Sequence, residues 1–134
     1  MKQLFVLTFA LLSINFIMAQ DSSSESGVLM NFETKFVDFG LVKKGQKKEH
    51  SYVFTNTGEE DIKIDLVSAC ECTTTDYPRR AIKPGETASI DIVFDSTEKE
   101  ESETVDVDVF LQNINPATDT PYIEMLQFKF ELEK

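Results

Sequence analysis

Residues 105–111 read Val105-Asp106-Val107-Asp108-Val109-Phe110-Leu111, the clearest pattern in the chain. Apolar residues occupy every second position, and aspartates lie between the valines. Successive side chains of a β-strand point to opposite faces, so this period of two is typical of a strand with one buried face. We therefore predict a strand with four core-facing residues, Val105, Val107, Val109 and Leu111.

Comparable patterns recur before and after this stretch, with turn residues between them. The expected strands cover residues 30–36, 36–42, 48–55, 62–67, 73–77, 89–94, 105–111 and 122–132. Two further alternating sets are expected in the core: Ile62, Ile64 and Leu66, then Ile90, Ile92 and Phe94. The last segment changes parity between Met125 and Leu126, and a β-bulge at that point would reconcile its two halves.

Seven to eight short strands without a convincing amphipathic helix favour an all-β fold, namely an immunoglobulin-like β-sandwich. A small barrel is the alternative. The sequence lacks tryptophan, and its two cysteines are too close together to bridge opposite sheets. The Cys–Trp–Cys core of antibody domains therefore does not apply.

Both cysteines lie in the stretch Ser68-Ala69-Cys70-Glu71-Cys72-Thr73-Thr74. Strand-like alternation ends at Leu66, so we expect this stretch at the end of a sheet rather than within a strand. Four interpretations stay open: a disulfide, a free buried pair, a soft-metal site for copper or zinc, and a thiol pair that exchanges with or bridges to another chain.

Geometry and composition constrain two of these interpretations. Cα atoms two residues apart in an extended strand are about 6.5–7 Å apart, at the limit for a disulfide, so a disulfide requires a tight turn at Glu71. A closed zinc site usually takes four cysteine or histidine ligands, and His50 is the only histidine. Cys70 and Cys72 are thus the candidate thiol or disulfide pair, and only weak candidates for a metal site.

The N-terminal residues have the pattern of a secretory signal peptide. Lys2 precedes a mostly apolar run, and Ala19 supplies a small residue before a cleavage point. We predict a signal peptide at residues 1–19, a disordered serine-rich leader at 20–29 and one domain at 30–134. After cleavage the chain would have no membrane-spanning segment, and it would be periplasmic or extracellular.

The charge of the chain limits its partners. The formal net charge is −11, and loss of residues 1–19, which hold one base and no acid, would leave −12. Such a surface repels phosphate backbones and anionic membranes, so nucleic acid is not an expected partner. An unidentified envelope or secreted protein fits better, and the oligomeric state is left open.

Other groupings with catalytic or binding chemistry are weak. His50 would be the histidine of a Ser–His–Asp hydrolase, but it shares strand parity with Tyr52 and Phe54, so packing beside aromatic rings is expected instead. Asp106, Asp108 and the acidic loop at 98–103 could supply oxygen ligands for calcium, but no EF-hand spacing is present. We therefore predict no catalytic residues and no cofactor.

Several motifs together resemble the bacterial family labelled domain of unknown function 1573. They are Phe36-Val37-Asp38-Phe39-Gly40 with Gly45, Phe54-Thr55-Asn56-Thr57-Gly58, the Cys-x-Cys-Thr stretch, Ile82-Lys83-Pro84-Gly85-Glu86 and Ile90-Asp91-Ile92-Val93-Phe94-Asp95. The resemblance implies an exported immunoglobulin-like domain akin to major-sperm-protein and pilus-chaperone domains, without an established activity. Two departures are Glu71, where the family usually has glycine, and the charged residues 98–101, which replace a glycine-containing loop.

Two functional hypotheses follow. The first is a non-catalytic module of the cell envelope that binds other proteins, for example by adding a partner's strand to a sheet edge. The second is a thiol-redox or soft-metal protein that acts through Cys70 and Cys72. Replacing both cysteines by serine should leave the first functional and abolish the second.

Overall fold

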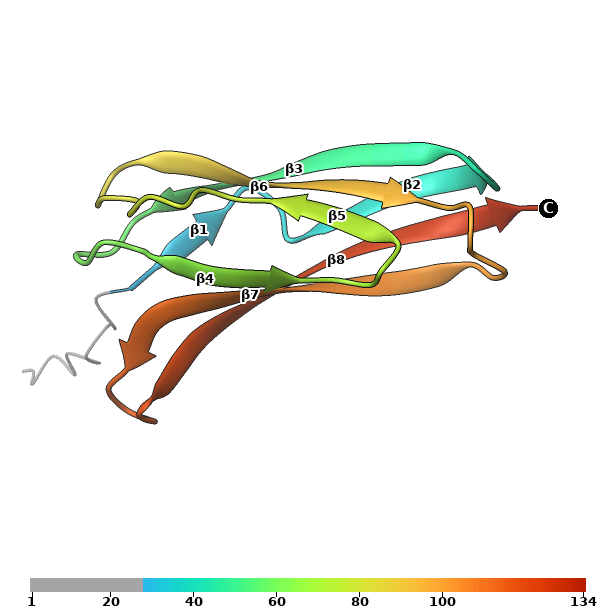
Figure 1. The fold of residues 1–134 in the computed structure, drawn as a ribbon. Helices are drawn as coiled ribbons and strands as arrows, with labels where there is room; N and C mark the ends of the chain where they lie inside the picture. The colour runs from blue at the N-terminus through green and yellow to red at the C-terminus, as the bar shows by residue number, and fades with distance from the viewer. Residues whose placement is uncertain (1–27) are drawn as a thin grey trace, which may run out of the picture.

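The computed structural model describes residues 28–134, which form two four-stranded β-sheets packed face to face (Figure 1). The strands are β1 (Met30–Phe32), β2 (Phe36–Lys43), β3 (Lys47–Asn56), β4 (Ile64–Ser68), β5 (Thr73–Asp76), β6 (Thr87–Asp95), β7 (Glu103–Asn115) and β8 (Thr120–Glu133). Two separate sheets exclude the barrel alternative, so the predicted β-sandwich is confirmed.

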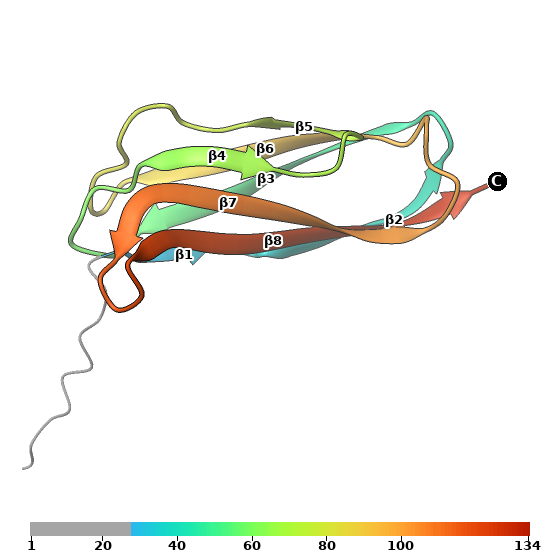
Figure 2. The same ribbon diagram turned by 60° about the horizontal axis from the view of Figure 1, so that its bottom comes forward.

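The two sheets have the strand orders β1-β3-β6-β5 and β2-β8-β7-β4. All neighbours are antiparallel except β2 and β8, which run parallel. The chain changes sheet several times, and Figure 2 shows β4 and β5, the outer strands of opposite sheets, side by side. The edge strands of the two sheets, β1, β5, β2 and β4, are therefore short or irregular.

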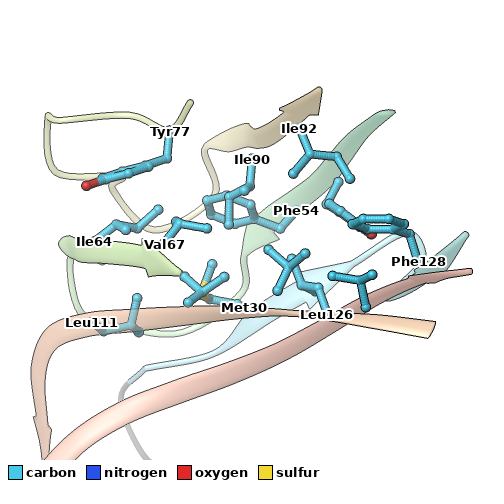
Figure 3. Packing of buried hydrophobic residues seen from close by; sticks show 14 of the residues in the cluster. Met30, Phe54, Ile64, Val67, Tyr77, Ile90, Ile92, Leu111, Leu126 and Phe128 are labelled. Atoms are coloured by element: carbon cyan, nitrogen blue, oxygen red, sulfur yellow. The ribbon is translucent and has the colours of Figure 1, made fainter. Parts of the chain in front are cut away.

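The core lies between the sheets, where alternate residues of both point inward (Figure 3). The predicted core faces of two strands are confirmed, because the following side chains are all buried: Ile90, Ile92, Phe94, Val105, Val107, Val109 and Leu111. In β3, Tyr52 and Phe54 are buried as their shared parity predicted. The close-up shows Ile90 and Ile92 facing Leu126 and Phe128 across the sandwich.

The prediction for Leu66 is wrong. Its side chain is 51% exposed, whereas the neighbouring Val67 is buried. The pairing of β4 with β7 shifts register between Ile64 and Leu66. An extra residue there reverses the parity of the strand, which turns Leu66 outward and Val67 inward.

The expected bulge between Met125 and Leu126 is also wrong. β8 pairs with β7 in unbroken register from Ile123 to Phe130. Leu126 is buried, while Ile123 and Met125 are 53% and 61% exposed, because strict alternation places them on the outer face. The irregularity lies in β7 instead, between Phe110 and Ile114.

The N-terminal boundaries also differ from expectation. Val28 and Leu29, which we assigned to the leader, belong to the domain: Val28 is buried, and the Leu29 carbonyl accepts a 3.0 Å hydrogen bond from the Thr57 N–H. The first expected strand is shortened to β1, and Phe36 begins β2 as an exposed residue. The predicted signal peptide and most of the predicted leader lie outside the described residues.

Candidate functional site

The cysteine pair lies in the connection between the two sheets. Residues 69–72, the cysteine crossover, link the end of β4 at Ser68 to the start of β5 at Thr73 (Figure 1). The expected position at a sheet end, rather than within a strand, is confirmed. The crossover must reverse direction within four residues, which the small Ala69 and the turn at Glu71 permit.

Cys70 and Cys72 form a disulfide, with their Cα atoms 5.1 Å apart. The Thr73 N–H donates a 2.9 Å hydrogen bond to the Cys70 carbonyl, which closes a turn around Glu71. Among residues 28–134 the only non-glycine residue with positive φ is Asp119, so Glu71 completes this turn without left-handed backbone. A glycine is therefore not required between the cysteines.

The disulfide is partly buried and held by its neighbours. The Thr73 hydroxyl lies 3.2 Å from the Cys70 sulfur and 3.5 Å from the Cys72 sulfur. The Cys72 carbonyl accepts a 2.8 Å hydrogen bond from the Asp95 N–H at the end of β6. One side of the disulfide packs against the core, and the other is open to solvent.

A shallow cavity of about 340 Å³ lies beside the disulfide, lined by Glu71, Cys72, Asp95, Thr97 and Glu98. The Thr97 hydroxyl and backbone N–H both donate to the Asp95 carboxylate, which lowers the pKa of Asp95. Sequence analysis did not associate residues 95–98 with the cysteines, since only the pairing of β5 with β6 brings them together. The lining is acidic, unlike the electropositive surroundings typical of reactive cysteines.

Metal ligands are not assembled in the described part of the chain. No group of three or more histidine, cysteine or carboxylate side chains there could hold a metal ion. The acidic residues considered for calcium are divided: Asp106 lies on β7, Glu100 pairs with Lys44 at 2.9 Å, and Glu103 pairs with Lys99.

His50 packs beside an aromatic ring, as predicted. Its ring meets that of Tyr52 edge to face, with centroids 4.6 Å apart. Burial lowers the pKa of His50. Its Nε2 atom is buried and has no hydrogen-bond partner within residues 28–134. In this arrangement no serine or carboxylate of the described chain is hydrogen-bonded to the ring.

A second candidate site is an exposed apolar surface on the sheet β2-β8-β7-β4. Leu66, Phe110 and Ile123 are aligned in register across β4, β7 and β8, and Met125 follows on β8. We call these four residues the outer apolar face. Leu66, Ile123 and Met125 are more than half exposed, and Phe110 is half-buried. Sequence analysis missed this surface, because Leu66 was assigned to the core face of its strand and a bulge was expected between Met125 and Leu126.

Solved structures with the same architecture come from distant sources. A protein of unknown function from Porphyromonas gingivalis W83 matches with a TM-score of 0.63 and 20% identity, covering 78% of this chain and 47% of that one. The PapD-like domain 7 (ASH domain) of human CEP192 matches with a TM-score of 0.63 and 11% identity, covering 82% and 89%. The Vibrio cholerae VesB protease matches with a TM-score of 0.60 and 10% identity, covering 81% and 32%.

These likenesses establish the fold alone, and the PapD-like match confirms its immunoglobulin-like character. The chain spans about a third of the VesB structure and about half of the P. gingivalis structure. No curated protein matches it by sequence. A family model described as "Protein of unknown function (DUF1573)" matches residues 30–125. Within residues 28–134 there is no helix with the length and apolarity needed to cross a membrane.

Proposed function

Since this chain belongs to the DUF1573 family of proteins of unknown function, we propose that it is an exported, non-catalytic immunoglobulin-like module of the bacterial cell envelope that binds other proteins. The outer apolar face is the observation that carries this proposal. Contiguous exposed apolar patches are uncommon on monomeric soluble proteins and often mark interaction sites. A face of four large side chains, placed on three adjacent strands, fits that description.

The sheet edges are poorly suited to pairing with a partner's strand, so the outer apolar face is the better candidate for partner binding. Along β4, the carbonyls of Asp65 and Val67 already accept hydrogen bonds from the Tyr77 and Thr75 hydroxyls, at 3.3 and 3.5 Å. Backbone groups that are already paired cannot form a ladder with an incoming strand.

The backbone of the edge strand β2 is likewise partly occupied by hydrogen bonds to side chains. The Gly40 N–H donates to the Asp38 carboxylate at 2.8 Å, the Lys43 N–H donates to the Gln46 side chain at 2.9 Å, and the strand is irregular between Asp38 and Leu41. The remaining edges, β1 and β5, have three and four residues. We therefore assign partner binding to the face rather than to an edge.

Export is proposed from the pattern of residues 1–19 and from the disulfide. Disulfides persist in oxidising compartments and are rare in the cytosol. Cleavage between Ala19 and Gln20 is the expected processing step. N-terminal sequencing of the protein recovered from the periplasm or medium tests it, and exported material that retains Met1 would contradict it.

A site-specific photo-crosslinker tests the binding role. Placed at Met125 on the outer apolar face, it should form adducts with another protein in the bacterium that makes this chain. Placed at Ser51, an exposed residue on the opposite sheet, it should not. The Met125 adducts should persist when Cys70 and Cys72 are both serine. Equal labelling from both positions, or no adduct at Met125, would refute the proposal.

The disulfide supports a second candidate, a thiol-redox or soft-metal role of Cys70 and Cys72. The specific observation is that the disulfide is partly exposed and borders the 340 Å³ cavity. The three carboxylates of that cavity place this role second, since reactive thiolates favour positive surroundings. Loss of all biological function in the double serine variant, with the fold and the Met125 adducts intact, would favour it over the binding role.

A further inference from the structure

One carboxylate on the outer apolar face lacks part of its hydration. Asp108 lies on β7, in register between Ser68 of β4 and Met125 of β8. Its Oδ1 atom is buried and has no hydrogen-bond partner within the described chain. By contrast, the neighbouring Asp106 accepts a 2.7 Å hydrogen bond from the Gln127 side chain. Asp108 is therefore the unsatisfied acceptor on this surface.

The partial burial of Asp108 changes the free energy that its carboxylate gains from pairing with a cation of a partner. An exposed ion pair contributes little because water and salt screen it, and burying the two charges costs their hydration. Asp108 has already lost water from one oxygen during folding, so a cation that approaches it displaces less water. The apolar neighbours Phe110 and Met125 also lower the local dielectric constant, which strengthens the attraction.

The charges around the outer apolar face are mostly negative. Asp65, Asp106 and Asp108 lie on β4 and β7, and Lys129 is the basic residue further along the outer face of β8. The whole chain carries −11. A second copy would bring the same negative charges against this surface, so like-charge repulsion opposes a symmetric dimer through it.

Building on the proposed function, we propose that the outer apolar face binds a basic, amphipathic polypeptide segment, with Asp108 accepting a lysine or arginine of that segment. Leu66, Phe110, Ile123 and Met125 receive the apolar side chains of the partner. Asp108 borders this apolar row, two residues from Phe110 along β7 and opposite Met125, so it selects partners whose basic residue lies next to apolar ones. This arrangement combines apolar burial with a charge that fixes orientation and partner choice.

Peptide binding by the purified full chain tests this inference. The probe is a fluorescent peptide of alternating valine and lysine, and its counterpart alternates valine and glutamate. Fluorescence anisotropy at low salt should show binding of the basic peptide alone. Asp108→Asn and Met125→Ser should each weaken that binding about tenfold, equivalent to ~1.4 kcal/mol. Asp91→Asn removes the same charge from the opposite sheet and should leave the affinity within about twofold.

Three results would overturn the inference. Equal effects of Asp108→Asn and Asp91→Asn would mean that net charge alone attracts the peptide. Equal binding of the acidic peptide would remove the role of charge. A dimer in sedimentation velocity that Met125→Ser dissociates would make a second copy the occupant. If crosslinks at Met125 persist in any of these cases, the protein-binding role stands and only the basic partner is refuted.

Discussion

The Tyr52 hydroxyl on β3 donates a 2.7 Å hydrogen bond to the backbone carbonyl of Gln127 on β8, and so joins the two sheets across the core. The Tyr52 side chain is buried in the core, and this burial raises the pKa of its hydroxyl. The same β8 segment carries Met125 on its outer surface. This bond therefore fixes β8 against the opposite sheet directly behind the outer apolar face.

Tyr52→Phe should reduce the free energy of unfolding by about 1 kcal/mol, because it removes one buried hydrogen bond and keeps the ring. Urea unfolding measures the change. Tyr122→Phe is the matched control, since no hydrogen bond of the Tyr122 hydroxyl occurs within residues 28–134. A larger loss in the control would contradict this assignment.

Stability should fall at acidic pH through His50. Burial lowers the pKa of His50 below 6.5, so the unfolded chain takes up a proton at a pH where the folded chain does not. Stability is therefore complete above pH 6.5 and declines as the pH falls below it. His50→Gln should show a smaller decline in melting temperature between neutral and mildly acidic pH.

Three carboxylates affect the stability of the fold in a separate, lower pH range. Hydrogen bonds from Arg80, Thr97 and Lys44 lower the pKa values of Glu86, Asp95 and Glu100, respectively, from ordinary values of 4.5, 3.8 and 4.5. Their contributions to stability are therefore present above pH 4.5 and are lost as the pH falls through the lowered values. These groups titrate alike in wild type and His50→Gln. If the two proteins have identical profiles above pH 5, His50 does not couple to folding.

Asn56→Ala should destabilise the fold by about 2–4 kcal/mol. The buried Asn56 amide donates to the carbonyls of Glu60 and Ile82 at 2.8 and 2.9 Å, and its oxygen accepts from the Gly58 N–H at 3.0 Å. Alanine leaves the Glu60 carbonyl and the Gly58 N–H without these partners, and the Ile82 carbonyl keeps only its hydrogen bond from the Ile62 N–H. Asn31→Ala, at an exposed position of β1, should change the urea midpoint little.

Val107→Asp should cost several kcal/mol or prevent folding, because it buries an unpaired carboxylate in the core. Met125→Asp introduces the same group on β8, where the side chain is exposed, and should be nearly neutral for stability. Far-UV circular dichroism during denaturation compares them. Similar losses in the two variants would mean that the core and outer faces are wrongly assigned.

Opening the disulfide should change stability by no more than about 1.5 kcal/mol. A bond between residues two apart closes a very small loop, so it restricts the unfolded chain little. After brief mild reduction, both thiols should react with an alkylating reagent while circular dichroism stays unchanged. Thiols that react only in denaturant would instead indicate a buried structural pair.

Much of the fold followed from the period of the sequence. Alternation at Val105, Val107 and Val109 identified a strand and its buried face, because side chains of a strand alternate wherever its partners lie. The loss of alternation after Leu66 likewise placed the cysteine stretch at a sheet end. The motifs around Asn56 and Pro84 indicated the family from local sequence alone.

The tertiary structure decided the outer apolar face. Alternation shows which residues share a face, but the position of a bulge depends on how a strand pairs with its neighbour. The irregularities in β4 and β7 turned Leu66 outward and left Met125 in unbroken register on the outer surface. The same pairing placed Asp108 beside Met125 and brought Asp95 to Cys72. Contacts between strands far apart in the chain create these groupings, and no local pattern records them.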